Sequence, residues 1–166
     1  MPRIQLLGSG AILREVMAAA DMLAEDFGVL ADLWSATSLN ELRRDGVAAE
    51  RWSMLHPQEK RRQSYVETCL VDRPGPIVAA TDSMRLYADQ IRPYLPGKHY
   101  TVLGTDGFGR SDTRKKLRHF FEVDRRYVVV AALKALADTG AIDVAKVREA
   151  IQKYGIDPEK PNPVTV

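Results

Sequence analysis

Apolar and polar positions along the chain follow a pattern of short strands, each succeeded by helical segments. Residues 4–7 form an apolar run bounded by GSG, which predicts a buried strand. From Ser9 or Gly10 to Phe27 the apolar residues recur at the spacing of one helix face, and Gly28 suits the C-terminal cap. We expect that face to consist of Ile12, Val16, Met17, Ala20, Leu23, Ala24 and Phe27.

The next segment repeats this order with a strand at 29–36 and several helices. Ser38 and Glu41 have the spacing of a capping box, which predicts a helix start at Ser38. We expect this short helix to end near Asp45 and Gly46. Two further helices are predicted at residues 48–55 and 58–71, the latter with Tyr65, Cys69 and Leu70 on its inner face.

The second half of the chain contains two more apolar runs of strand length. The predicted elements are a turn at 72–76, strands at 77–80 and 100–103, and helices at 83–95, 112–121 and 127–137. Residues 128–130 are all valine and favour a strand, but the good helix formers that follow favour a helix for 127–137. Asp143 is expected to cap a last helix with Val144, Val147 and Ile151 inward, ending before Gly155.

This succession of strands and helices predicts an α/β fold with a largely parallel sheet. We expect one domain, residues 1–156, and an extended C-terminal tail, residues 157–166, which prolines interrupt. Ligands of such sheets bind beyond the carboxyl ends of the strands. The turns expected there are residues 8–10, 36–38, 80–83 and 104–112.

Composition narrows the class of protein. The 166 residues are 45% hydrophobic and 28% charged, with a net charge of +2, which is too small to indicate nucleic-acid binding without a local basic stripe. No apolar run is long enough for a membrane span, and the N-terminus lacks a signal peptide. The single cysteine, Cys69, allows no intrachain disulfide and indicates a reducing, cytoplasmic setting.

The glycine-rich stretch GTDGFGRSD at 104–112 allows two interpretations. It has neither the lysine of a phosphate-binding Walker loop nor the glycine spacing of a dinucleotide fingerprint. Ser111 is expected to cap the next helix, whose N-terminus could bind an anion beside Arg110 and Arg114. The simpler hypothesis is a tight structural turn in which Phe108 anchors the loop in the core.

Other candidate groups form no convincing catalytic set. His56 and Glu59 are close enough in sequence for an acid/base pair, although a surface histidine is the simpler interpretation. Asp82 and Asp106 each follow a strand and could bind a cation, but such aspartates more often cap turns. Cys69 is expected to be a buried, inert thiol, and no G-x-S-x-G elbow is present.

Basic residues cluster at 60–62, 115–116 and 125–126, with acidic residues interleaved. A solvated face is the first interpretation of these clusters, and a patch for an acidic protein partner is the second. Trp34 and Trp52 are expected to be core or interface anchors.

Several stretches resemble one known family. They are IQLLGSGAILREV, ATSLNELRRDG, ERWSMLHP, ATDSMRLYADQIRPYLP, GTDGFGRSDTRKKLRHFFEVD and YVVVAALKALADTG. They are similar to the C-terminal domain of transketolase-like, thiamine-diphosphate enzymes, and more narrowly to that of the homodimeric pyruvate dehydrogenase first component. The resemblance covers residues 4–162. It implies a three-layer αβα sandwich whose mostly parallel five-stranded sheet has one antiparallel strand.

The resemblance also implies a function for the intact enzyme. That enzyme would decarboxylate pyruvate on thiamine diphosphate and reductively acetylate the lipoyl group of the dihydrolipoyl acyltransferase component. The domain itself would supply scaffold and dimer contacts. Its expected partners are the upstream domains, a second copy of the enzyme and the acyltransferase component, with no nucleic acid and no membrane. Met1 is then not expected to be the natural start.

The same resemblance assigns no catalytic, cofactor-binding or metal residue to this chain. The family's GDG and NN signature is missing, and no position matches its catalytic histidines or its cofactor-activating glutamate. Thiamine diphosphate and magnesium would belong to the upstream domains. Two alternatives stay open: a free-standing module that docks an acidic or lipoyl-bearing partner, and a small enzyme that uses Asp82, Asp106 and the helix start at Ser111.

Overall fold

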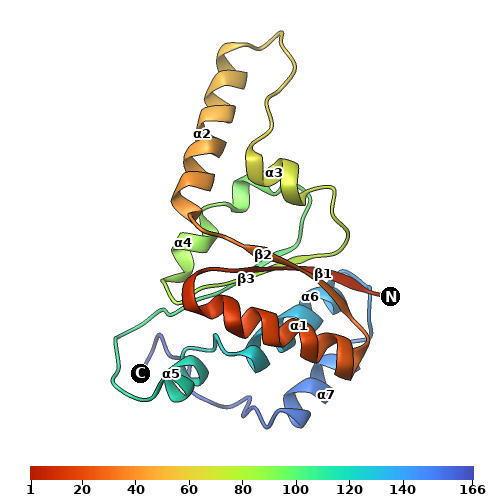
Figure 1. Cartoon of the computed structure of the whole chain (residues 1–166), viewed down its shortest axis with the longest axis vertical. Helices are drawn as coiled ribbons and strands as arrows, with labels where there is room; N and C mark the ends of the chain where they lie inside the picture. The colour runs from red at the N-terminus through yellow and green to blue at the C-terminus, as the bar shows by residue number, and fades with distance from the viewer.

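The computed structural model describes all residues, 1–166, and its centre is a parallel sheet (Figure 1). The strands are β1 (Arg3–Gly8), β2 (Leu30–Ser35), β3 (Ile77–Ala80) and β4 (Tyr100–Leu103). They lie in the order β2-β1-β3-β4, and every neighbouring pair is parallel. All four strands predicted from the sequence are therefore confirmed.

The sheet has four strands, without the fifth, antiparallel strand that the resemblance implies. One further segment, residues 128–130, had the composition of a strand. The valine-rich stretch lies instead inside helix α6 (Arg125–Asp138), as its helix-forming neighbours predict. The C-terminal tail has prolines at 158, 161 and 163, which cannot donate hydrogen bonds to a strand ladder.

Helices cover both faces of the sheet and confirm the three-layer α/β architecture. One face carries α1 (Leu13–Phe27), preceded by the 3-10 turn η1 (Gly10–Ile12), together with α5 (Arg114–Phe120), α6 and α7 (Ala145–Lys153). The other face carries α2 (Leu39–Leu55), α3 (Tyr65–Leu70), α4 (Arg85–Asp89) and the 3-10 turn η2 (Arg92–Tyr94). No helix is both long enough and apolar enough to cross a bilayer.

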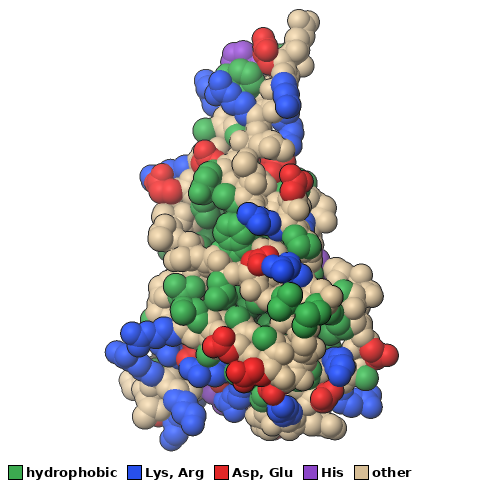
Figure 2. Space-filling view, turned by 45° about the vertical axis from the view of Figure 1, so that its right-hand side comes forward, with side chains coloured by type: hydrophobic (Ala, Val, Ile, Leu, Met, Phe, Trp, Pro, Cys, Tyr) green, Lys and Arg blue, Asp and Glu red, His purple; other side chains and the backbone are tan.

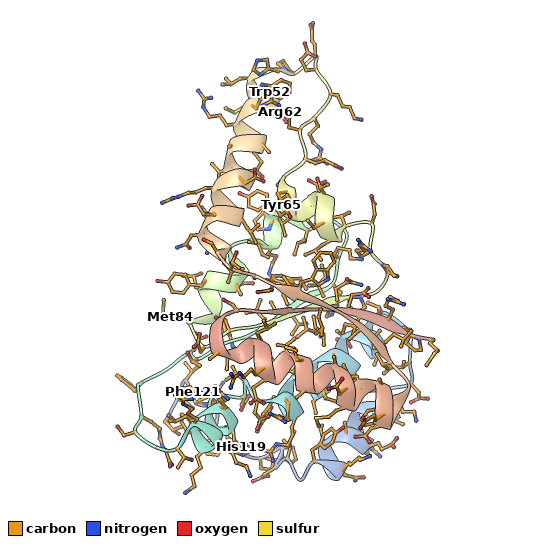
Figure 3. All side chains as sticks on the ribbon, in the orientation of Figure 1. Trp52, Arg62, Tyr65, Met84, His119 and Phe121 are labelled. Carbon is orange, nitrogen blue, oxygen red and sulfur yellow. The ribbon has the colours of Figure 1, made fainter.

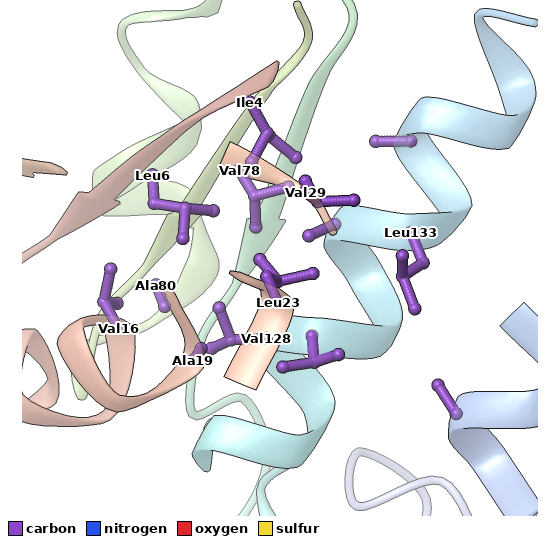
Figure 4. Packing of buried hydrophobic residues seen from close by; sticks show 14 of the residues in the cluster. Ile4, Leu6, Val16, Ala19, Leu23, Val29, Val78, Ala80, Val128 and Leu133 are labelled. Atoms are coloured by element: carbon purple, nitrogen blue, oxygen red, sulfur yellow. The ribbon is translucent and has the colours of Figure 1, made fainter. Parts of the chain in front are cut away.

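Two hydrophobic cores separate these layers. Ile4 and Leu6 of β1 face α1 and α6, where they pack with Leu23 and Leu133 (Figure 4). Leu7 faces the opposite core with Leu70. The alternation of side chains along the strand places consecutive residues in different cores, so β1 is buried on both faces.

The inner face of α1 differs partly from the expected set. Ile12, Val16 and Leu23 are buried as predicted, but Met17 and Ala24 are exposed, and Ala19 is buried in their place. Val16 and Ala19 belong to the core that α1 shares with α6, and packing against α6 accounts for the shift.

The predicted break at Gly46 is wrong: α2 continues without interruption to Leu55 and projects away from the sheet (Figure 1). The predicted helix at 58–71 is also shorter, since only α3 is helical there. Residues 58–64 contain no large apolar side chain, so a helix at that position would have no face to bury.

Three other boundaries differ from the prediction. The segment 83–95 splits into α4 and η2, because Pro93 cannot donate a helical hydrogen bond. The cap of α5 is Thr113 rather than Ser111, and its hydroxyl accepts from the Lys116 N–H. The last helix begins at Ala145, so Val144 precedes it and is 65% exposed.

Candidate functional site

The loops after β3 and β4 meet at the carboxyl edge of the sheet, where a parallel α/β fold usually binds ligands. The Thr105 N–H donates to the Ser83 carbonyl over 2.9 Å. The Asp106 carboxylate accepts from the Arg85 N–H over 3.0 Å. At Gly104 an added Cβ would lie 2.8 Å from the Arg85 nitrogen, so glycine permits this close approach. The glycine-rich stretch is thus fastened to its neighbouring loop.

The C-terminal tail packs on the same loop. Gly107 has a φ of 105°, and a Cβ there would lie 2.5 Å from the Pro163 carbonyl oxygen. The tail backbone therefore lies against one side of the loop at Gly107, whereas the other side lines a surface hollow of about 510 Å³. The neighbouring Phe108 is 82% exposed, so the prediction that it anchors the loop in the core is wrong.

The proposed anion groups are not gathered around Ser111. The helix that follows begins at Arg114, and Thr113 provides its cap. The Arg110 guanidinium lies over the Phe120 ring, 4.1 Å from its centroid. These contacts favour the structural-turn interpretation of the glycine stretch over the anion-binding one.

The two aspartates lie at one edge but have separate surroundings. Asp106 binds the backbone and side chain of Arg85, with 3.8 Å to the guanidinium Nε. Asp82 is exposed beside Gly10. No three acidic, histidine or cysteine side chains gather closely enough to hold a metal ion. The turn-capping interpretation therefore fits Asp106 well.

His56 lies at the far end of the α2 projection, not in a cleft. Its ring stacks on Trp52 with 4.2 Å between centroids, and its Nδ1 is 2.7 Å from the Trp52 carbonyl. Arg62 covers the same tryptophan, 3.8 Å from the ring centroid (Figure 3). The one hydrogen bond between His56 and Glu59 runs from the Glu59 N–H to the His56 carbonyl, so their side chains form no acid/base pair.

Cys69 lies in a partly apolar pocket of about 540 Å³ between α2, α3 and the end of β2. The thiol is only partly buried, which corrects the prediction of full burial. Trp34 also lines this pocket, and its indole N–H donates to the buried Gln5 amide, so Trp34 anchors β2 to β1 as expected of a core residue.

A buried carboxylate that the sequence pattern did not indicate lies on the opposite side of the sheet. Glu15 is 6% exposed and accepts hydrogen bonds from the Arg125 N–H and Nε and from Arg118, over 2.8, 3.0 and 3.1 Å. Burial alone would raise the pKa of Glu15, but the hydrogen bonds and charges of the two arginines outweigh it and lower the pKa. Asp124 holds Arg126 nearby, over 2.8 Å.

The carboxyl edge combines these tied loops with exposed apolar side chains. Met84, Leu86 and Tyr87 on and beside α4 are 50, 69 and 44% exposed, and Phe108 projects from the adjacent loop. The edge has no nucleophile paired with a base. Its chemistry is that of a packing surface.

Comparison with known proteins agrees with this description. Residues 1–124 match the family model of the transketolase-like C-terminal domain. The chain is 66% identical over 161 residues to the pyruvate dehydrogenase E1 component of Pseudomonas aeruginosa and 61% identical over 165 residues to that of Cupriavidus necator. It is 56% identical over 161 residues to the Escherichia coli K12 protein. These matches cover 97 to 99% of this chain but only 18% of each relative. The chain belongs to the family of transketolase-like C-terminal domains.

Proposed function

We propose that this chain is the C-terminal domain of a pyruvate dehydrogenase first component. The intact enzyme then decarboxylates pyruvate on thiamine diphosphate and reductively acetylates the lipoyl group of the dihydrolipoyl acyltransferase component. High identity to E1 components along almost the whole chain supports this assignment. The single cysteine supports a reducing, cytoplasmic setting.

The residues of this chain do not fit thiamine diphosphate and its magnesium ion. A diphosphate needs free N–H groups or cations, and magnesium needs oxygen ligands that are not already engaged. Here Asp106 is already engaged by Arg85, and no three acidic, histidine or cysteine side chains gather closely enough to hold the ion. We therefore assign the cofactor to the part of the enzyme outside this chain, and assign no catalytic step to these residues.

The role that we assign to the domain is to pack against a second copy of the enzyme. The observation that carries this proposal is the apolar carboxyl edge, where Leu86 is 69% and Phe108 is 82% exposed. Large apolar side chains that are exposed along one edge of the sheet are unfavourable in water and are typical of an interface. In this proposal the domain contributes an interface, and the rest of the enzyme carries out the reaction.

The size of the native polypeptide is the first test. An antibody raised against this chain should detect, in a lysate of the source cells, a band several times larger than the 18.5 kDa of these residues. A band at 18.5 kDa would instead favour the free-standing module.

The second test concerns the dimer. In the full-length polypeptide, Leu86→Asp with Phe108→Asp should weaken dimerisation roughly 100-fold in sedimentation experiments, because two apolar anchors are replaced by charges. Val144→Asp is the matched control, since this residue is 65% exposed but lies at the start of α7. An unchanged dimer in the double variant would overturn the interface, whereas the band size tests the enzyme assignment separately.

A further inference from the structure

Basic charge is concentrated in one short part of this chain. Residues 110–126 contain seven lysines and arginines and three acidic residues, while the whole chain has a net charge of +2. The remainder of the chain is therefore net acidic. Figure 2 shows a group of Lys and Arg side chains at the lower left, on the side where α5 lies. The segment forms α5 and the start of α6, so its charge lies on one face of the fold.

The surface at this segment is hollowed. One hollow of about 510 Å³ lies between η1, the glycine-rich loop and α5, and a second of about 620 Å³ lies between α5, α1 and α6. Both are lined by Arg114 and Arg118, so the two hollows adjoin across α5. We call these two adjoining hollows together the α5 groove. Apolar side chains also line it, among them Leu117 and Met22.

The positive charges of the α5 groove are of two kinds. Arg118 and Arg125 are held by the buried Glu15, and Arg126 is held by Asp124, so these guanidinium groups are fixed in position. Arg114 and Lys115 are exposed and form no ion pair within the chain. The free charges therefore lie beside fixed ones, an arrangement that attracts an anionic partner electrostatically.

We propose that the α5 groove binds an extended acidic segment of a partner protein, with apolar side chains between its carboxylates. At about 510 and 620 Å³, each hollow is much larger than a single phosphate, and the apolar lining matches side chains rather than a sugar-phosphate backbone. The carboxylates of Asp82, Glu15 and Asp124 also line the walls and interrupt the positive charge, which suits carboxylates separated by apolar side chains better than the evenly charged backbone of nucleic acid. The groove involves none of the residues assigned to the dimer.

Fluorescence anisotropy with the native, full-length polypeptide tests this proposal. The probe is a short fluorescein-labelled peptide of alternating glutamate and leucine. Arg114→Glu with Lys115→Glu should weaken binding roughly tenfold or more, and added NaCl should weaken binding to the unaltered protein. Arg43→Glu with Arg148→Glu is the control: both are exposed, form no ion pair and give the same change in net charge, so binding should be unchanged.

Four results would overturn the proposal. They are unchanged binding in the Arg114 and Lys115 double variant, equal binding of a glutamine-leucine peptide, tighter binding of a single-stranded DNA oligonucleotide, and displacement of the peptide by inorganic phosphate alone. The last two would assign the groove to nucleic acid or to a small anion. If the charge reversal prevents folding, Arg114→Gln with Lys115→Gln removes the same charges and should still weaken binding. Circular dichroism checks that each variant is folded.

Discussion

Gly46 of α2 lies directly against the ring of Tyr94. A Cβ added at Gly46 would lie 2.6 Å from two ring carbons, closer than van der Waals contact allows. Tyr94 is only 5% exposed and lies in η2, so its ring has little room to move. The missing side chain therefore lets α2 pass close to η2, and the helix continues to Leu55.

We expect Gly46→Ala to destabilise the chain by up to about 2 kcal/mol net, because the clash should cost about 1–3 kcal/mol, the usual range for overpacking. Alanine stabilises a helix by about 1 kcal/mol relative to glycine. The measured loss of unfolding free energy is therefore the cost of the clash minus this gain. Urea denaturation measures the change. Gly109→Ala is the control, because no atom lies within 4 Å of its added Cβ, and it should change stability by less than about 0.5 kcal/mol. Equal stability of both variants would mean that the ring moves freely.

Gln5 is a fully buried amide that links β1 to its surroundings. Its Nε2 donates to the Asp32 carboxylate and the Pro74 carbonyl over 2.8 and 2.9 Å, and its Oε1 accepts from Trp34 Nε1 over 2.8 Å. Gln5→Leu should cost about 2–4 kcal/mol, because it leaves the indole N–H and the carbonyl without partners. Urea denaturation followed by tryptophan fluorescence tests this.

The control for Gln5 is Gln152→Leu, which makes the same chemical change at an exposed position of α7. We expect that variant to unfold at nearly the same urea concentration as the unaltered chain. Equal midpoints for the two variants would show that the Gln5 hydrogen bonds add nothing net to stability.

The strands and the two long helices on one face could be predicted from the sequence because their signals are local. The hydrophobic periodicity, the capping residues and the flanking glycines predicted β1, β2, α1 and α6. These signals need no knowledge of the elements that pack against them. The continuity of α2 through Gly46 could not be predicted, since it depends on Tyr94, which lies in a different segment.

The sequence alone excluded some kinds of binding site, but it could not predict which contacts the candidate residues make. Motif spacing alone ruled out a Walker loop and a dinucleotide fingerprint. The packing of Gly107 depends on the tail at Pro163, and the burial of Glu15 depends on arginines more than 100 residues away. Such contacts between residues far apart in the sequence determine which polar side chains are buried, and no local sequence pattern predicts them.

The cluster around Glu15 makes stability depend on pH. Because the arginines lower the folded-state pKa of Glu15 below its ordinary value of 4.5, its ion pairs stabilise the chain above pH 4.5. This contribution is lost as the pH falls through the lower, folded-state pKa. Glu15→Gln keeps the shape of the side chain but not the charge. It should cost about 1–2 kcal/mol at neutral pH, less than for a fully buried pair, because Arg125 is half-exposed.

Urea unfolding at several pH values checks this linkage. The difference in unfolding free energy between the unaltered chain and Glu15→Gln should shrink as the pH falls below 4.5. Glu25→Gln, an exposed change in the same helix, should give no such pH-dependent difference. A constant difference at every pH would argue that the glutamate acts through shape and hydrogen bonding, not charge.

One bidentate ion pair ties the segment that returns from the α2 projection to α3. Arg61 donates to both carboxylate oxygens of Glu67 over 2.6 and 3.0 Å, and Glu67 is 6% exposed in α3. Arg61→Ala should speed amide hydrogen exchange in residues 58–64 roughly tenfold, because this segment has few other contacts to the body. Exchange in the sheet should stay the same. Lys60→Ala removes a neighbouring exposed charge that forms no ion pair and should leave exchange in 58–64 unchanged. Equal exchange in the two variants would mean that the Trp52–Arg62 stack, not the ion pair, holds the segment.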